Sequence, residues 1–227
     1  MVTLGPRFPD RRLGRPILGL VAAVLFLSSC SAASGFQYVS SSDRRAYFKV
    51  PYNWTFYDKR DILVASGQSL SAISNQQIAW LIGFDSDPDP SLDHVLDITQ
   101  PPLYPVIEAR VEQLNFQSRD QVALGSLRNV VYPVDQLERS NQAEILSYED
   151  VVTDDGYHGS TMVYDIILGG VSRVMLGNAV IRVNQTALLD PATQKLYLFT
   201  IRCESHCYQA NKALIDQIAQ SWTVKEH

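Results

Sequence analysis

The clearest chemistry near the C-terminus belongs to two cysteines, Cys203 and Cys207, in the stretch Cys-Glu-Ser-His-Cys. In an oxidising compartment such an isolated pair usually closes as a disulfide, and a spacing of four places the Cα atoms about 6 Å apart on a helical turn. Free thiols are one alternative. A metal site that adds Glu204 and His206 is another, although four ligands within so short a stretch surround a tetrahedral ion poorly. We predict the disulfide.

A cluster of aspartates raises the question of a calcium site. Within residues 85–97 the chain carries Asp85, Asp87, Asp89, Asp93 and Asp97. The alternating start is typical of a calcium loop, but counted from Asp85 the sixth position is Pro90 instead of glycine, and the twelfth is Leu96 instead of glutamate. We therefore predict a solvated acidic loop. Weak calcium binding and contact with a basic partner are the alternatives.

The histidines do not form a catalytic motif with any neighbour. They are His94, His158, His206 and His227. The sequence contains no G-x-S-x-G elbow, no P-loop, no H-E-x-x-H and no dinucleotide fingerprint. We therefore assign no catalytic residue, no metal ligand and no cofactor. A hydrolase with a non-standard site at Asp155 and His158 is the enzymatic alternative.

The N-terminus predicts export. Four arginines precede an apolar run of about 12 residues, at 16–27, which is shorter than the roughly 20 that span a bilayer. The ending Leu27-Ser28-Ser29-Cys30 resembles the lipobox of bacterial lipoproteins, in which the cysteine thiol receives diacylglycerol and becomes the first mature residue. This resemblance implies a signal peptide at 1–29 and a lipidated Cys30. An ordinary signal peptide with a chance cysteine is the alternative.

The location and charge of the mature chain follow from this reading. Diacylglycerol on Cys30, with palmitate-type acyl chains, would hold the protein on the extracytoplasmic face of the cell membrane. Removal of 1–29 takes away four arginines and one aspartate, a net charge of +3, so the formal charge falls from −5 to −8. Such an acidic balance argues against binding to nucleic acid and against an electrostatic grip of the chain as a whole on anionic lipids. The small residues after Cys30 predict a flexible tether at 30–43, followed by one domain at 44–227.

Strand patterns and hairpin turns dominate that domain. Apolar or alternating runs predict strands at 46–50, 54–57, 77–85 and 104–114. Asp155-Gly156 is a hairpin signal inside residues 144–167, and a second hairpin is predicted around 190–193.

Helix signals are fewer. Ser118 and Gln121 form a capping box, and the apolar residues Leu214, Ile215, Ile218, Ala219 and Trp222 define one helical face within residues 207–222. Hairpins combined with helices in mid-chain and at the end predict an α+β fold, a central antiparallel β-sheet with helices packed on it.

Two stretches resemble PsbP-like domains. Phe48-Lys49-Val50-Pro51-Tyr52-Asn53-Trp54 is similar to the opening "strand, Pro, two residues, Trp" of that family. Residues 195–200 and the ending Ser221-Trp222-Thr223-Val224 are similar to its closing strand, final helix and last short strand. The group includes photosystem-associated proteins and LpqN-like lipoproteins of actinobacteria, so the resemblance implies a PsbP-like sandwich over residues 44–226. Residues 85–97 and 166–183 do not match it. We expect Trp54 and Trp222 to be core residues.

These observations favour a binding function. We expect a non-enzymatic accessory lipoprotein, tethered through Cys30, with an envelope protein as partner. The alternative is a carrier of a small apolar ligand such as an envelope lipid, with the glycine-containing stretch 166–183 lining a groove.

Overall fold

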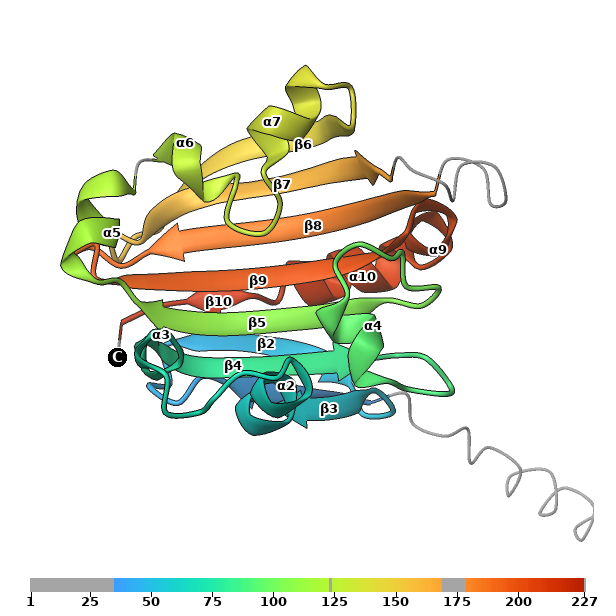
Figure 1. Ribbon diagram of the computed structural model, residues 1–227, viewed down its shortest axis with the longest axis horizontal. Coiled ribbons are helices and arrows are strands. Elements are labelled where there is room, and N and C mark those ends of the chain that lie inside the picture. The colour runs from blue at the N-terminus through green and yellow to red at the C-terminus, as the bar shows by residue number, and fades with distance from the viewer. Residues whose placement is uncertain (1–34, 123, 169–178, 227) are drawn as a thin grey trace, which may run out of the picture. The chain divides into compact units, whose positions relative to one another are not determined.

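A large antiparallel sheet forms the centre of the fold (Figure 1). The structure, a computed structural model, describes residues 35–122, 124–168 and 179–226. The predicted signal peptide, Cys30 and the middle of 166–183 lie outside these residues. The strand order of the seven-stranded sheet is β3-β4-β5-β9-β8-β7-β6. Its strands are β3 (Thr55–Asp58), β4 (Ile78–Asp85), β5 (Val106–Gln113), β6 (Ala143–Val152), β7 (His158–Ile167), β8 (Val180–Leu189) and β9 (Lys195–Glu204).

A second, three-stranded sheet covers one face of the large one. It consists of β1 (Phe36–Ser40), β2 (Ala46–Pro51) and β10 (Thr223–Val224), in the order β1-β2-β10. Strand β1 corrects the predicted tether: residues 36–40 pair with β2 and belong to the domain. The buried side chains of β2, among them Phe48, pack in one cluster with Phe199 of β9 and Ile107 of β5. This cluster between the two sheets is the main core.

Helices cover both faces of the large sheet. On the side of the small sheet, α9 (Ser205–Ala210) and α10 (Lys212–Ala219) contribute Tyr208, Ile215 and Ile218 to the main core. On the other face, α6 (Leu124–Leu127), α7 (Val134–Arg139) and the neighbouring segments contribute to two smaller clusters over β7–β9, and α5 (Phe116–Gln121) lies between two of these segments. The helices α2 (Lys59–Ala65), α3 (Ile73–Gln77) and α4 (Leu92–Leu96) contact β4. None of these described helices has the length and apolar character needed to cross a membrane.

The predicted α+β class and both hairpins are confirmed. The β6–β7 turn contains Gly156 at φ 81°, a left-handed conformation that glycine adopts without steric cost. The β8–β9 turn is closed by Asp190, whose side chain accepts hydrogen bonds from the backbone N–H groups of Gln194 and Lys195. Local turn chemistry therefore fixes the register of four neighbouring strands.

Two helix predictions need correction. The N-cap of α5 is Asn115, whose side chain accepts from the Ser118 N–H at 2.8 Å, so the predicted box at Ser118 lies inside the helix instead of at its start. The predicted C-terminal helix is two helices, because α9 ends at Asn211 and α10 begins after it. The predicted apolar face is nevertheless correct, since Ile215 and Ile218 are completely buried.

Candidate functional site

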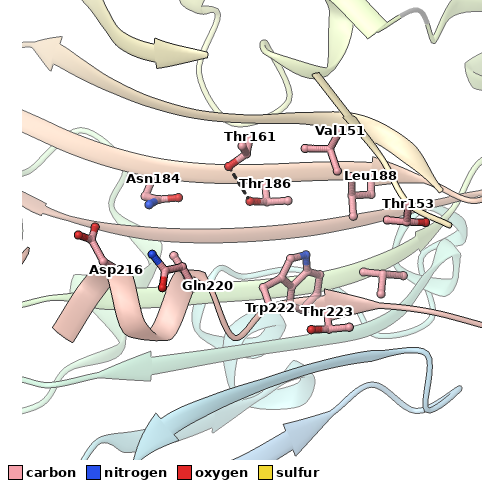
Figure 2. A pocket seen from close by; sticks show the side chains of 12 residues that line it. Val151, Thr153, Thr161, Asn184, Thr186, Leu188, Asp216, Gln220, Trp222 and Thr223 are labelled. Carbon is pink, nitrogen blue, oxygen red and sulfur yellow. Dashed lines mark hydrogen bonds between the residues drawn. The ribbon is translucent and has the colours of Figure 1, made fainter. Parts of the chain in front are cut away.

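A groove with a volume of about 400 Å³ lies between α10 and the outer strands of the large sheet (Figure 2). We call it the Trp222 groove. Helix α10 and residues 222–224 form one wall, and β6, β7 and β8 form the other. Side chains alternate along a strand, so β8 turns every second residue toward this groove, namely Asn184, Thr186 and Leu188. The residues between them, such as Gln185 and Ala187, face the opposite side of the sheet.

Trp222 forms the inner end of one wall and carries an unused hydrogen-bond donor. Its ring stacks on Phe199 at a centroid distance of 5.0 Å, and only 9% of the residue is exposed. The indole Nε1 is buried and has no hydrogen-bond partner among the described residues. In Figure 2 this nitrogen points toward Thr186, across the groove. A buried indole N–H usually finds a partner, and leaving one unmade costs about 1–3 kcal/mol. Trp222 is therefore a core residue, as predicted, and its buried indole N–H has no partner although the residue lines the groove.

The opposite wall is lined by neutral polar groups. The hydroxyl oxygens of Thr161 and Thr186 lie 3.1 Å apart and form a hydrogen bond, and the Asn184 amide donates to the Tyr208 hydroxyl at 3.3 Å. Figure 2 shows the side-chain amide of Gln220 on the α10 side of the same space. These hydroxyls and amides can donate to or accept from a ligand.

Charges beside the groove are paired. Asp216, the carboxylate in its lining, accepts from Lys212 one helical turn away. On the neighbouring part of the same sheet face, Arg182 makes two hydrogen bonds of 2.7 Å to Asp165. This guanidinium also lies 5.7 Å from the Tyr208 ring. With its charges neutralised, the groove is suited to a neutral ligand that has hydrogen-bonding groups and an apolar portion. The apolar portion would contact Leu188 and Val151.

The aspartate cluster is more ordered than predicted. Asp85 is only 1% exposed, which corrects the prediction of a wholly solvated loop. Its carboxylate accepts from the backbone N–H groups of Asp87 and Ser91 at 2.9 and 3.0 Å, and it lies 2.8 Å from His94 Nδ1. The other aspartates are partly or fully exposed. Among the described residues, no three His, Cys, Asp or Glu side chains are arranged to hold a metal ion. Asp85 therefore organises the loop.

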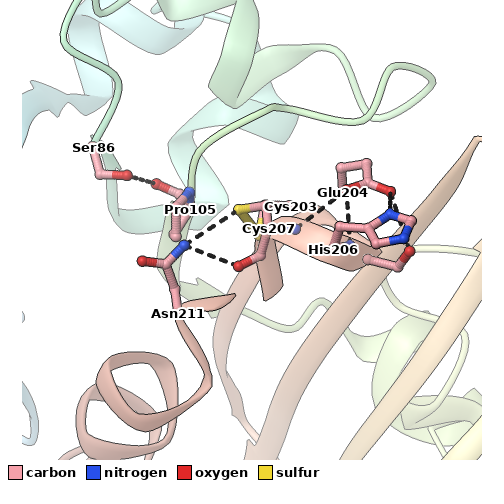
Figure 3. Close-up of a disulfide and its surroundings, with 8 residues drawn as sticks. Ser86, Pro105, Cys203, Glu204, His206, Cys207 and Asn211 are labelled. Atoms are coloured by element: carbon pink, nitrogen blue, oxygen red, sulfur yellow. Dashed lines mark hydrogen bonds and ion pairs between the residues drawn. A yellow bond between two sulfur atoms is a disulfide. The ribbon is translucent and has the colours of Figure 1, made fainter. Parts of the chain in front are cut away.

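The predicted disulfide is present (Figure 3). Cys203 and Cys207 have Cα atoms 6.0 Å apart. They join the end of β9 to α9, so the pair spans a strand-to-helix corner, whereas the prediction placed it on one helical turn. Glu204 caps α9 by accepting from the backbone N–H groups of His206 and Cys207. This arrangement fixes the corner and supports the predicted disulfide.

The other chemically active residues lie apart from the groove lining. Asp155 accepts from the backbone N–H of Glu226 at 3.1 Å, and His158 Nδ1 is 3.4 Å from the Gly156 carbonyl, both at the β6–β7 turn. The side chain of His206 is 96% exposed and contacts Glu204. Part of the stretch 166–183, which we predicted to line a groove, falls outside the described residues. The described groove is formed mainly by later residues of β8 and by the segment after α10.

The chain is similar to known proteins in its structure. No family model matches the sequence, and no curated protein matches it. Among solved structures, the chain is similar to cyanobacterial PsbP (CyanoP) from Synechocystis, with 16% identity, 88% of this chain and 99% of the other covered, and a TM-score of 0.44. It is similar to LpqN of Mycobacterium tuberculosis, described as involved in cell envelope biogenesis, with 12% identity, 85% and 91% coverage, and a TM-score of 0.40.

A third similar structure is the Ran-binding protein Mog1p of Saccharomyces cerevisiae. Its identity is 11%, the coverage is 85% of this chain and 96% of the other, and the TM-score is 0.44. The structural neighbours thus include PsbP and LpqN, the two kinds of protein that the sequence resembles.

Proposed function

We propose that this chain is a lipid-anchored binding protein that works on the extracytoplasmic face of the cell membrane and holds a neutral, partly apolar ligand in the Trp222 groove. The unpartnered indole N–H of Trp222 carries this proposal, because it is buried beneath the groove wall and a local movement of that wall would let a ligand acceptor satisfy a donor that the protein itself leaves free. The hydroxyls of Thr161 and Thr186 supply further hydrogen bonds.

The composition of the groove supports binding without catalysis. Its lining consists of hydroxyl, amide, aliphatic and aromatic side chains and of Asp216, which is paired with Lys212. A nucleophile beside a general base, which covalent catalysis uses, is absent from this described lining. The sequence suggested a small apolar ligand such as an envelope lipid as an alternative, and the polar groups of the groove add that this ligand should also offer hydrogen-bonding groups. An envelope lipid with a neutral headgroup has both properties.

The test compares the lipidated protein with a Trp222→Phe variant, both purified from the native membrane in detergent. Organic extraction followed by mass spectrometry then identifies non-covalently bound molecules. The phenyl ring keeps the apolar contact but removes one hydrogen bond, so we expect retained ligand to fall about three- to tenfold. Trp80→Phe is the matched control, because Trp80 lies on β4, outside the groove lining.

Two outcomes would count against the groove. One is that none of the three preparations releases a bound molecule. The other is equal retention by the wild type and by Trp222→Phe. The protein's own acyl chains do not interfere, since a thioether-linked diacylglycerol is covalent.

An accessory role for a membrane complex is the wider part of the proposal. Tethering confines the domain to the membrane surface, which raises its effective concentration near envelope proteins without any specific contact. Crosslinking in intact cells followed by affinity capture tests this part. We expect one envelope protein to recur across replicates, and capture of the chain alone would contradict the accessory role.

A further inference from the structure

The outer face of the three-stranded sheet carries an unusual set of side chains. On β2, Ala46, Phe48 and Val50 are buried, so the residues that alternate with them point away from the core. The register places these outward residues opposite those of β1 and β10. We define the outer face by six residues: Phe36, Tyr38, Tyr47, Lys49, Pro51 and Thr223.

Three aromatic rings and Lys49 lie on this outer face, and Lys225 lies beside it. Tyr38 is 83% exposed, far more than a large ring in a folded core. Lys49 Nζ lies 5.2 Å from the centre of the Phe36 ring, and Lys225 Nζ lies 5.7 Å from that of Tyr47. The six residues include no acid, although the whole chain has a formal charge of −5. Tyrosine and lysine together are typical of surfaces at a membrane–water interface.

The position of this sheet along the chain indicates which partner its outer face would contact. Strand β1 starts at Phe36, six residues after Cys30. Six residues reach at most about 20 Å when fully extended. If Cys30 carries diacylglycerol, as the proposed function requires, β1 is therefore held within about that distance of the lipid surface. We propose that the outer face docks on the membrane, with the exposed Tyr38 among the headgroups and Lys49 and Lys225 near lipid phosphates, while Phe36 stays partly buried against the main core.

Docking in this way would set the orientation of the Trp222 groove. Thr223 belongs to the outer face and also lines the groove, because β10 is an edge strand of the small sheet and directly follows Trp222. The groove would therefore border the headgroup layer. A ligand drawn from the membrane could then reach the groove over a short path.

The test uses the full lipidated chain in vesicles of phosphatidylcholine containing phosphatidylglycerol and a phospholipid with a photoreactive headgroup. After illumination, mass spectrometry locates the lipid adducts. We expect adducts on the outer face, above all on Tyr38, and few on Phe116, which is 79% exposed on α5. A Lys49→Glu variant should lower the adducts on the outer face about fivefold or more, and a Phe116→Glu variant should leave them unchanged.

The results separate docking from anchoring. Intact-mass analysis shows whether Cys30 carries lipid, and the adduct pattern shows which face meets the membrane. Lipidated protein with equal adducts on Tyr38 and Phe116 would overturn docking while leaving the anchor in place. Tyr38 that is protected from lipid by contacts between two copies of the chain would also overturn it. If the yield of adducts on the outer face is the same in Lys49→Glu as in the wild type and does not fall at high salt, the electrostatic part of the proposal is wrong.

Discussion

Arg202 holds the aspartate-rich loop from beneath. This residue on β9 is only 4% exposed, and its guanidinium donates to the backbone carbonyls of His94, Val95 and Asp97, at 3.0, 2.7 and 3.3 Å. Those carbonyls belong to the end of α4 and the residue after it, where a helix leaves acceptors unsatisfied. Asp85 organises the same loop from the other end, so two buried charges determine its shape.

We predict that Arg202→Met destabilises the domain by about 3 kcal/mol, because one buried and two partly buried carbonyls lose a charged donor. For a domain of this size that corresponds to a fall in Tm of roughly 6–12 °C. Thermal unfolding followed by circular dichroism measures it. Arg60→Met, a change at an exposed arginine on α2, is the control. If both variants have the same Tm as the wild type, Arg202 does not stabilise the loop.

Asp43 gives the protein an acid-sensitive contact. Burial by itself would raise the pKa of this carboxyl, but hydrogen bonds, including those from Ser41, Lys195 and Tyr197, outweigh it and lower the pKa from 3.8 to about 2. A carboxyl with a depressed pKa in the folded state contributes stability above its unfolded pKa. That contribution is lost as the pH falls through the folded value.

We therefore expect Asp43→Asn to flatten the pH dependence of stability between about pH 4 and pH 2. Urea midpoints should converge with those of the wild type at the acid end and diverge above about pH 4. An exposed aspartate, Asp89, provides the control: Asp89→Asn should follow the wild type across the range. Parallel curves for Asp43→Asn and the wild type would show that the contact contributes nothing in this window.

At the scale of strands, Gly159 marks a close approach between β7 and β8. A Cβ atom added there would lie 1.9 Å from the carbonyl oxygen of Ala187, which is backbone and cannot swing aside. We expect Gly159→Ala to cost about 2–3 kcal/mol and to lower Tm by roughly 4–12 °C. In Gly125→Ala the added carbon meets open space on α6, so this control should melt no earlier than the wild type. Equal Tm values for the two variants would refute the steric argument.

Local patterns predicted many of the elements. The turns at Asp155-Gly156 and around Asp190 are short-range features, and the apolar run of β4 and the alternation in β5 reflect burial on sheet faces. Strand β1 was missed because its alternation covers only five residues and its partner, β2, stabilises it. The split between α9 and α10 was missed because the apolar periodicity of α10 predicts a helix but carries no signal of the helix boundary at Asn211.

The Trp222 groove was not predictable in the same way. Its walls are formed by residues that lie far apart in the chain, such as Thr161, Thr186 and Gln220, and no short motif links them. Sequence analysis correctly placed Trp222 in the core. The missing hydrogen-bond partner of its indole depends on which groups surround it after folding, and a sequence pattern does not report that.

For the molecule as a whole, the proposed anchor on Cys30 would decide where the domain works. We predict that Cys30→Ser abolishes lipid attachment, because serine lacks the thiol that forms the thioether, and that residues 1–29 stay attached. Intact-mass spectrometry of membrane-derived protein measures both changes. Ser34→Ala, which lies in the predicted tether, should be lipidated and cleaved normally. A lipidated Cys30→Ser product, or an unlipidated wild type, would remove the lipoprotein interpretation.

The three-stranded sheet also constrains the order in which the protein can fold. Its central strand, β2, pairs with β10, and the Lys49 N–H donates to Ser221 Oγ across a sequence separation of 172 residues. Contacts so distant in the chain form late, since a long loop must close before they are gained. If the chain is exported N-terminus first, as we propose, β2 would emerge with one edge still unpaired. The small sheet would then be completed only after the segment around Trp222 has also emerged.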